Sequence, residues 1–148
     1  MFINPKTNPV DRTALSVAFT VGLYGAAFGA AGVTAGFSIL QTCLLSLLLF
    51  SGASQFAVVG IMGAGGAAIS AIATATLLGF RNALYGIQMA PILKVKGLKR
   101  ILSAQITIDE STAVSTLQEN DSDRRRGFYI TGIGVYVFWN LFTYLGAL

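Results

Sequence analysis

The sequence contains no histidine and few charged residues: Lys, Arg, Asp and Glu together make up 11% of its 148 residues. Soluble domains carry roughly 25% charge. The shortage is concentrated in residues 13–80, where no charged side chain occurs. As a helix, a run of this length would extend about 100 Å, whereas the hydrocarbon core of a bilayer is about 30 Å thick. The run excludes a soluble enzyme or a nucleic-acid-binding domain and predicts an integral membrane protein made of helices.

Other absences narrow the chemistry that the chain can perform. Without histidine, it has neither an imidazole base nor a histidine metal ligand. Cys43 is the single cysteine and lies in an apolar stretch, so it forms no disulfide within the chain. The sequence shows no phosphate-binding loop and no nucleophile–base pair. We therefore expect no enzymatic activity, no bound metal and no cofactor.

Five apolar segments follow a polar entry at residues 1–12, where Pro5 and Pro9 oppose helix formation. The segments cover, to within several residues, 13–37, 38–62, 67–93, 101–118 and 127–148. The predicted fold class is all-α: a polytopic helical membrane protein with about five hydrophobic segments, some of them broken or re-entrant. Residues 1–148 form a single membrane domain with no visible internal repeat, and no matching half for an inverted repeat is expected.

The basic residues fall in three places and leave the orientation in the membrane open. They are Lys6 with Arg12, the stretch 94–100 and the run 124–126. Cytoplasmic loops carry an excess of Lys and Arg. If all five segments crossed the membrane, the two sides would carry five and four basic residues, which decides nothing. A re-entrant segment would change this count.

Four glycines in the first segment have the spacing of one helix face. Gly25, Gly29, Gly32 and Gly36 follow one another at intervals of four, three and four residues. Small residues on one face let a second helix approach closely in a membrane. We predict helix packing on this face, with sliding or rocking between the helices as the functional alternative.

The middle of the second segment is polar. Ser51, Gly52, Ser54 and Gln55 occur where the bilayer would be most apolar, and they weaken the helix and add hydrogen-bonding groups. Such a patch is tolerated where it faces protein or a water-filled cavity. Discontinuous helices of this kind build the substrate sites of transporters. The alternative is hydrogen bonding that only holds helices together.

Ionisable residues mark the middle of the third and fourth segments. Arg81, followed by Asn82, lies near the centre of the third, and Asp109 and Glu110 lie at the centre of the fourth. A charge at the bilayer centre costs at least ~2.5–3.5 kcal/mol, so it is normally paired or faces water. Asp109 or Glu110 is the natural counter-ion of Arg81, and either acid suits a proton relay. Two alternatives stay open: Arg81 reaches the surface from a helix end, or the fourth segment lies on the membrane surface.

The fifth segment repeats this pattern. Trp139 and Asn140 lie close to its centre. Four segments thus place their least membrane-compatible residues near their own midpoints. This alignment predicts one polar chamber at the midplane of the membrane.

Three motifs resemble those of the AzlC family. They are FSGASQFA at 50–57, FRNALYG at 80–86 and IDE at 108–110, with Trp139 matching a tryptophan of the family's later segment. The family often has Asn and His where this chain has Gly79 and Asn82. The resemblance covers essentially the whole chain, whereas family members are longer. We therefore expect residues 1–148 to be the N-terminal part of a longer family chain.

The resemblance implies that the chain is the large subunit of a branched-chain amino acid exporter of the LIV-E type in the cell membrane of a prokaryote. Exporters of this family sometimes also transport methionine. Such exporters are secondary active and proton-coupled, and the family works with a small membrane partner of the AzlD type. Asp109 and Glu110 are expected to serve proton coupling or to form a charge pair. The expected substrate-binding residues are Gly52, Ser54, Gln55, Arg81, Asn82 and Tyr85.

Two other classes of function stay open from the sequence alone. A channel or passive pore subunit would share the polar lining but would need no proton gradient. A non-catalytic membrane assembly subunit would use the same polar residues only to hold helices together. Self-association of the chain into a homo-oligomer also stays open.

Overall fold

The computed structural model describes residues 8–148, and the regular structure in this range is helical throughout. The all-α prediction is confirmed. The count of about five segments is not, since the described residues form seven helices, with the second and fourth predicted segments each divided in two. Pro5 and Lys6 lie outside the described residues. The helices are α1 (Pro9–Thr34), α2 (Ile39–Leu48), α3 (Gly52–Gly63), α4 (Ala68–Leu93), α5 (Leu98–Gln105), α6 (Asp109–Thr116) and α7 (Asp121–Ala147).

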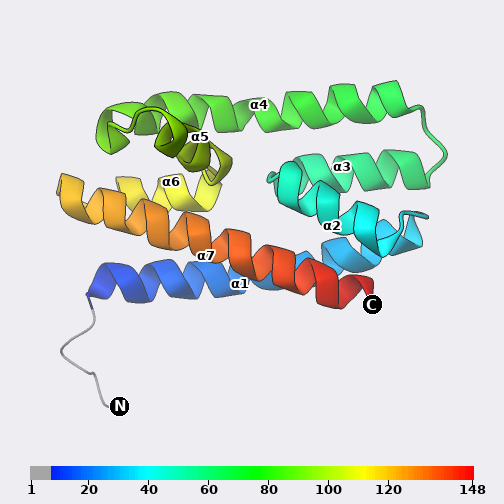
Figure 1. Cartoon of the computed structure of the whole chain (residues 1–148), viewed down its shortest axis with the longest axis horizontal. Coiled ribbons are helices and arrows are strands. Elements are labelled where there is room, and N and C mark those ends of the chain that lie inside the picture. The colour runs from blue at the N-terminus through cyan, green and yellow to red at the C-terminus, as the bar shows by residue number, and fades with distance from the viewer. Residues whose placement is uncertain (1–7) are drawn as a thin grey trace, which may run out of the picture.

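Three helices, α1, α4 and α7, run along the length of the molecule (Figure 1). They contain 26, 26 and 27 residues, which corresponds to about 40 Å each. Among the described residues, α1 and α7 are the two helices that combine the length and the hydropathy of a membrane span. α4 has the length but carries Arg81 and Asn82 in its middle.

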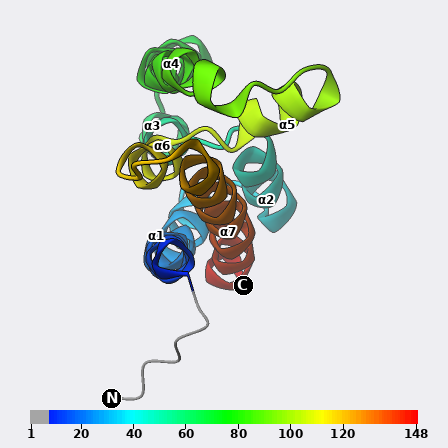
Figure 2. The ribbon, with the colours of Figure 1, turned by 90° about the vertical axis from the view of Figure 1, so that its left-hand side faces the viewer.

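Two helical hairpins occupy the space beside these helices: α3 and α6 lie between α4 and the α1–α7 pair, and α2 and α5 lie to one side (Figures 1 and 2). In the first hairpin, α2 enters from the end of the molecule where α1 finishes, and α3 returns to that end. In the second hairpin, α5 and α6 do the same from the opposite end. The two tips, residues 49–51 and 106–108, meet midway along the molecule. Each arm has 8 to 12 residues, or about 12–18 Å, and therefore covers at most about half the length of α1.

A long helix followed by a hairpin occurs twice in the chain. The helices α1, α2 and α3 contain 26, 10 and 12 residues, and α4, α5 and α6 contain 26, 8 and 8. The two units run in opposite directions along the molecule (Figure 1). The expectation that no inverted repeat is present is therefore wrong for the architecture. The sequence does not reveal the repeat because helix order and helix length, rather than a recurring residue pattern, carry it.

Local hydrogen bonds explain why the second hairpin turns at its tip. Thr107 Oγ1 donates to the carbonyl of Ser103 at 2.7 Å. Ser111 Oγ donates to the Ile106 carbonyl at 2.8 Å and accepts from the Ile108 amide at 3.1 Å. Ser and Thr side chains of this kind satisfy backbone groups that a continuous helix would otherwise pair. The second hairpin therefore closes its tip with its own residues.

Small residues line the contact between α1 and α7. A Cβ atom added to Gly25 or Gly29 would lie 2.3 or 2.1 Å from a carbonyl oxygen of α7, so a larger residue does not fit there. Gly32 lies against Thr42 of α2. Gly36 lies beyond the end of α1 with a φ of 90°. The expectation that all four glycines share one helix face is therefore wrong for Gly36, which turns the chain towards α2 in a conformation that glycine adopts without strain.

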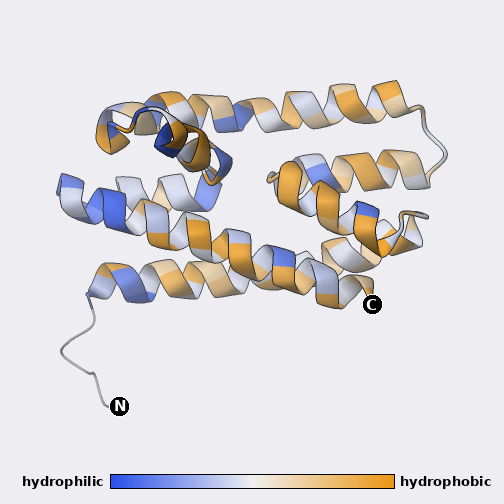
Figure 3. Ribbon diagram, viewed as in Figure 1, coloured by the Kyte–Doolittle hydropathy of each residue, from blue (hydrophilic) through white to orange (hydrophobic). Residues whose placement is uncertain are grey.

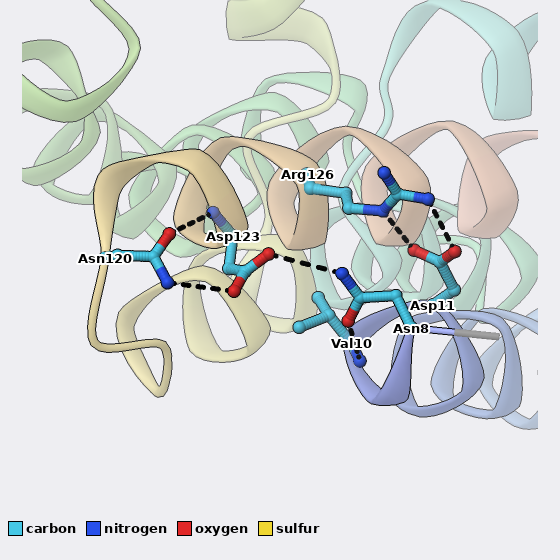
Figure 4. Close-up of polar contacts among 6 residues, drawn as sticks. All are labelled: Asn8, Val10, Asp11, Asn120, Asp123 and Arg126. Atoms are coloured by element: carbon cyan, nitrogen blue, oxygen red, sulfur yellow. Dashed lines mark hydrogen bonds and ion pairs between the residues drawn. The ribbon is translucent and has the colours of Figure 1, made fainter. Parts of the chain in front are cut away.

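Polar contacts tie the first turns of α1 and α7 together (Figure 4). Asn8 caps α1 and Asn120 caps α7, each by accepting a backbone N–H with its side-chain oxygen. Asn8 Nδ2 also donates to Asp123 Oδ1 at 3.4 Å. Arg126 Nη2 donates to Asp11 Oδ2 at 2.7 Å. The two helices therefore begin at the same level of the molecule.

Both of these helix starts differ from the sequence-based expectation. Pro9 is expected to oppose a helix, but α1 begins at this residue. Proline is favoured at the first helical position because its missing N–H would have no partner there. Residues 119–126 are expected to form a hydrophilic loop, but α7 begins at Asp121. The Asn120 cap stabilises this earlier start, which places the three arginines on the helix.

Charged side chains collect towards the end of the molecule where α1 and α7 begin (Figure 3). At the opposite end, the described connections 35–38 and 64–67 contain no charged residue. Because each hairpin returns to the end from which it came, Arg12 and the basic residues of 94–100 and 124–126 lie on one side. Among the described residues, the even split that five crossings would produce does not occur. The basic residues described on this side are Arg12, Lys94, Lys96, Lys99, Arg100, Arg124, Arg125 and Arg126.

Candidate functional site

An ion pair joins α4 to the tip of the second hairpin. Arg81 Nη1 lies 2.9 Å from Asp109 Oδ2. Arg81 comes from the middle of α4, and Asp109 is the first residue of α6. The predicted pairing of Arg81 with an acid of the fourth segment is confirmed, and Asp109 is the partner. The two side chains remain 44% and 40% exposed, so both charged groups are accessible from outside the protein.

Gln55 closes the tip of the first hairpin from inside the protein. Its side chain is fully buried. Gln55 Nε2 donates to the carbonyls of Leu49 at 2.6 Å and Ser46 at 3.3 Å. Gln55 Oε1 accepts from Trp139 Nε1 at 2.9 Å. The last carbonyls of a helix have no partner within that helix, and Gln55 supplies one for the end of α2 while it anchors α7.

The second hairpin and α7 also bind the end of α2. Gln105 Nε2 donates to the carbonyl of Leu47 at 3.0 Å. The Tyr136 hydroxyl donates to the same carbonyl at 3.1 Å. A backbone group without a partner at this depth in a bilayer would cost several kcal/mol. Side chains from three different elements, α3, α5 and α7, therefore hold the first tip in place.

Ser54 joins the first hairpin to α4. Its hydroxyl is fully buried, donates to the carbonyl of Ala75 at 2.8 Å and lies 3.1 Å from the Ser51 hydroxyl. A Cβ atom added to Gly79 would lie 3.2 Å from Ser54 Oγ. One added to Gly52 would lie 3.2 Å from the ring of Trp139. The polar stretch of the second segment is thus held by protein contacts, and in this conformation Ser54 has no surface to offer to a substrate.

The remaining predicted residues lie beside the ion pair on α4 and α6. Asn82 follows Arg81, and its Oδ1 is buried with no hydrogen-bond partner in the described structure. Asn140 Oδ1, on α7, is likewise buried with no hydrogen-bond partner in the described structure. Tyr85 is half-buried one turn beyond Arg81, and Glu110 is half-buried next to Asp109. Buried polar atoms normally have a partner, so the two asparagine oxygens are open acceptors near the middle of the molecule.

The structure therefore separates the predicted site into two groups. Arg81 and Asp109 come together at the start of α6, beside the second tip, with accessible charge. Ser54 and Gln55 belong to the first hairpin and are buried among protein partners. Their assignment to substrate binding stays a prediction that requires movement of the first hairpin.

Sequence reasoning missed Gln105 and Tyr136 as positioning residues. Both are side chains that reach across to the Leu47 carbonyl from elements far away in sequence. The polar character of Gln105 in an apolar context was the available signal. Its partner is a backbone carbonyl, which no residue pattern identifies.

The AzlC protein family matches residues 16–148. The chain belongs to the AzlC family. The match includes α1 from residue 16 onward, α7, both hairpins and the Arg81–Asp109 ion pair. No solved structure matches the chain.

Curated relatives of this AzlC-family chain are membrane proteins. An "uncharacterized membrane protein" of Archaeoglobus fulgidus is 34% identical over 140 residues, covering 95% of this chain and 58% of that protein. An "uncharacterized membrane protein" of Haemophilus influenzae is 26% identical over 155 residues, which cover 98% of this chain and 64% of that protein. The "Inner membrane protein YgaZ" of Escherichia coli is 29% identical over 123 residues, which cover 79% of this chain and 46% of that protein. The chain thus spans about half to two thirds of the length of these relatives.

Proposed function

We propose that this AzlC-family chain is the large subunit of a secondary transporter that exports leucine, isoleucine, valine or methionine, with proton coupling, from a prokaryotic cell. The observation that carries the proposal is the accessible Arg81–Asp109 ion pair midway along the molecule. Charges at the centre of a bilayer are costly unless they face protein or water. An amino acid carries one carboxylate and one ammonium group, so it complements this pair of opposite charges.

The hairpins suggest how the chain is arranged in the membrane. We propose that α1, α4 and α7 cross the bilayer and that each hairpin enters it halfway, because its arms measure about 12–18 Å against a core of about 30 Å. The described basic residues outside Arg81 lie on one side. By the positive-inside rule, this side faces the cytoplasm. The first hairpin then enters from outside and the second from the cytoplasm.

We propose a role for each group at the ion pair. Arg81 binds the substrate carboxylate, while Asp109 accepts from the substrate ammonium group, and the buried Oδ1 of Asn82 joins Asp109 only after a movement that exposes it. Tyr85, four residues after Arg81 on the same helix face, covers the apolar side chain. Either Asp109 or Glu110 takes the coupling proton when the substrate leaves. A small membrane partner of the AzlD type assembles with this subunit.

Export from vesicles tests the proposal. We expect Arg81→Ala to abolish leucine export from inside-loaded membrane vesicles that contain the chain together with the small partner, because the substrate carboxylate loses its counter-ion. Asp109→Asn, which keeps the shape of the carboxyl group, should reduce export at least tenfold (about 1.4 kcal/mol). Lys96→Ala removes one exposed positive charge on the basic side and serves as the matched control.

Two results would contradict this assignment. Export by Arg81→Ala at the wild-type rate would remove the ion pair from the substrate site. Leucine movement that persists unchanged after a protonophore collapses the proton gradient would favour a channel or passive pore over a coupled transporter. Chromatography of each variant shows whether it is still assembled, so that loss of fold is separated from loss of transport.

A further inference from the structure

A cavity of about 710 Å³ runs between α5 and α7 from the basic side of the molecule to the second hairpin tip, and neither Arg81 nor Asp109 lines it. We name it the α5–α7 groove. Its apolar wall is formed by Leu93, Val95, Leu102, Ile106, Ile133 and Tyr136.

Two basic side chains stand at the outer end of the α5–α7 groove. Lys99 lies in the first turn of α5 and Arg125 near the start of α7. Arg125 Nε donates to the carbonyl of Ile92 at 2.8 Å, which fixes the position of its guanidinium group. This bond uses one of the five N–H donors of the arginine. No carboxylate lines the groove in the described structure.

The shape of the groove indicates a long apolar ligand. From Arg125 to Tyr136, the α7 wall extends 11 residues, or about 16 Å. Leu102 and Ile133 remain 59% and 52% exposed, so the groove opens outward along its side. In the proposed arrangement, that opening faces the bilayer at the depth of the acyl chains, while Lys99 and Arg125 lie at the level of the headgroups.

We propose that the α5–α7 groove binds an anionic phospholipid, with its phosphate on Lys99 and Arg125 and an acyl chain along Leu102, Ile106 and Ile133. An amino acid substrate fits poorly, because its ammonium group would meet two positive charges and no acid. Basic pockets between membrane helices bind anionic headgroups in this way. The proposal concerns lipid binding and does not depend on which solute the chain transports.

The groove is also connected to the tips of the hairpins. Gln105 lines it and donates to the Leu47 carbonyl of the first hairpin. Tyr136 lines it as well and donates to the same carbonyl. A lipid behind α5 would therefore support the contacts that hold the two tips together.

Native mass spectrometry of the purified full chain tests the proposal. The probes are phosphatidylglycerol and phosphatidylcholine with identical acyl chains. We expect the wild type to retain phosphatidylglycerol in preference to phosphatidylcholine. The double variant Lys99→Gln/Arg125→Gln should lose about 25-fold in this preference, or about fivefold per basic residue. The control Arg12→Gln/Lys96→Gln removes the same charge from the same side outside the groove and should change the preference less than twofold.

A second variant keeps the proposal testable if the loss of Arg125 disturbs the fold. Ile133→Trp places a large ring in the groove and leaves every charge in place, so we expect it to reduce phosphatidylglycerol binding by a similar factor. Equal losses in the groove variant and the control would overturn the proposal in favour of general surface attraction. A wild type without lipid preference, or a dimer whose formation Ile133→Trp abolishes, would also overturn it.

Discussion

The two hairpins have the same shape but are stabilised in different ways. The tip of the first is closed by Gln55 from its own arm α3 and is also held from outside by Gln105 of α5 and Tyr136 of α7. The tip of the second is closed by its own Thr107 and Ser111. The first carries no charge, whereas the second begins α6 with two acids. A self-contained tip can move as a unit with its charge, while the first tip requires its neighbours to stay in place.

The largest expected effect concerns the first tip. Gln55→Ala would leave the carbonyl of Ser46 and the Trp139 N–H without their partner, while the Leu49 carbonyl would still accept from the Ser51 N–H. Each buried orphan group costs about 1–3 kcal/mol, so we expect the two groups to lower the free energy of unfolding by about 2 kcal/mol or more, measured by thermal or denaturant unfolding in detergent. Gln88→Ala, at an exposed position on α4, is the control. A loss no larger than that of the control would remove Gln55 from its anchoring role.

A smaller effect is expected at the second tip. Ser111→Ala removes the contacts to the Ile106 carbonyl and the Ile108 amide, which we expect to cost about 1–3 kcal/mol. Hydrogen exchange should speed up in residues 106–111 and leave the first hairpin unchanged, because the second hairpin closes its own tip. The exposed Ser122→Ala is the matched control. Faster exchange in both hairpins would show that their stabilities are coupled.

The smallest effect is expected where the two hairpins touch. Gln105→Leu removes one donor from the Leu47 carbonyl, but Tyr136 still donates to it. We expect a loss below about 1 kcal/mol, together with faster hydrogen exchange in the last turn of α2. Gln88→Leu introduces the same change at an exposed site of α4. Exchange at α2 equal to that of this control would mean that Gln105 does not link the tips.

The interior of the site could be predicted only in part. Arg81 and its acidic neighbours stand out because a charge in an apolar context needs a partner, and the ion pair with Asp109 follows. Asp109 is the partner because α6 begins at this residue. The hydroxyl groups of Thr107 and Ser111 at the second tip determine where α6 begins. The role of Gln55 was predicted as substrate contact, whereas the structure gives it three protein partners.

The sequence by itself determined the helical class, the membrane setting and the residues that break the apolar pattern, because these follow from composition and from the cost of burying charge. Only the tertiary structure decided that the second and fourth segments turn back. The backbone N–H and C=O groups of about 25 apolar residues find hydrogen-bond partners in one straight helix, and they also find them in two short helices whose tip is capped. At the first tip the caps come from Gln55, Gln105 and Tyr136, of which Gln105 and Tyr136 reach the end of α2 only when the chain is folded. At the second tip they come from Thr107 and Ser111. The two turns bring the described basic residues outside Arg81 to one side and the Arg81–Asp109 ion pair to the middle.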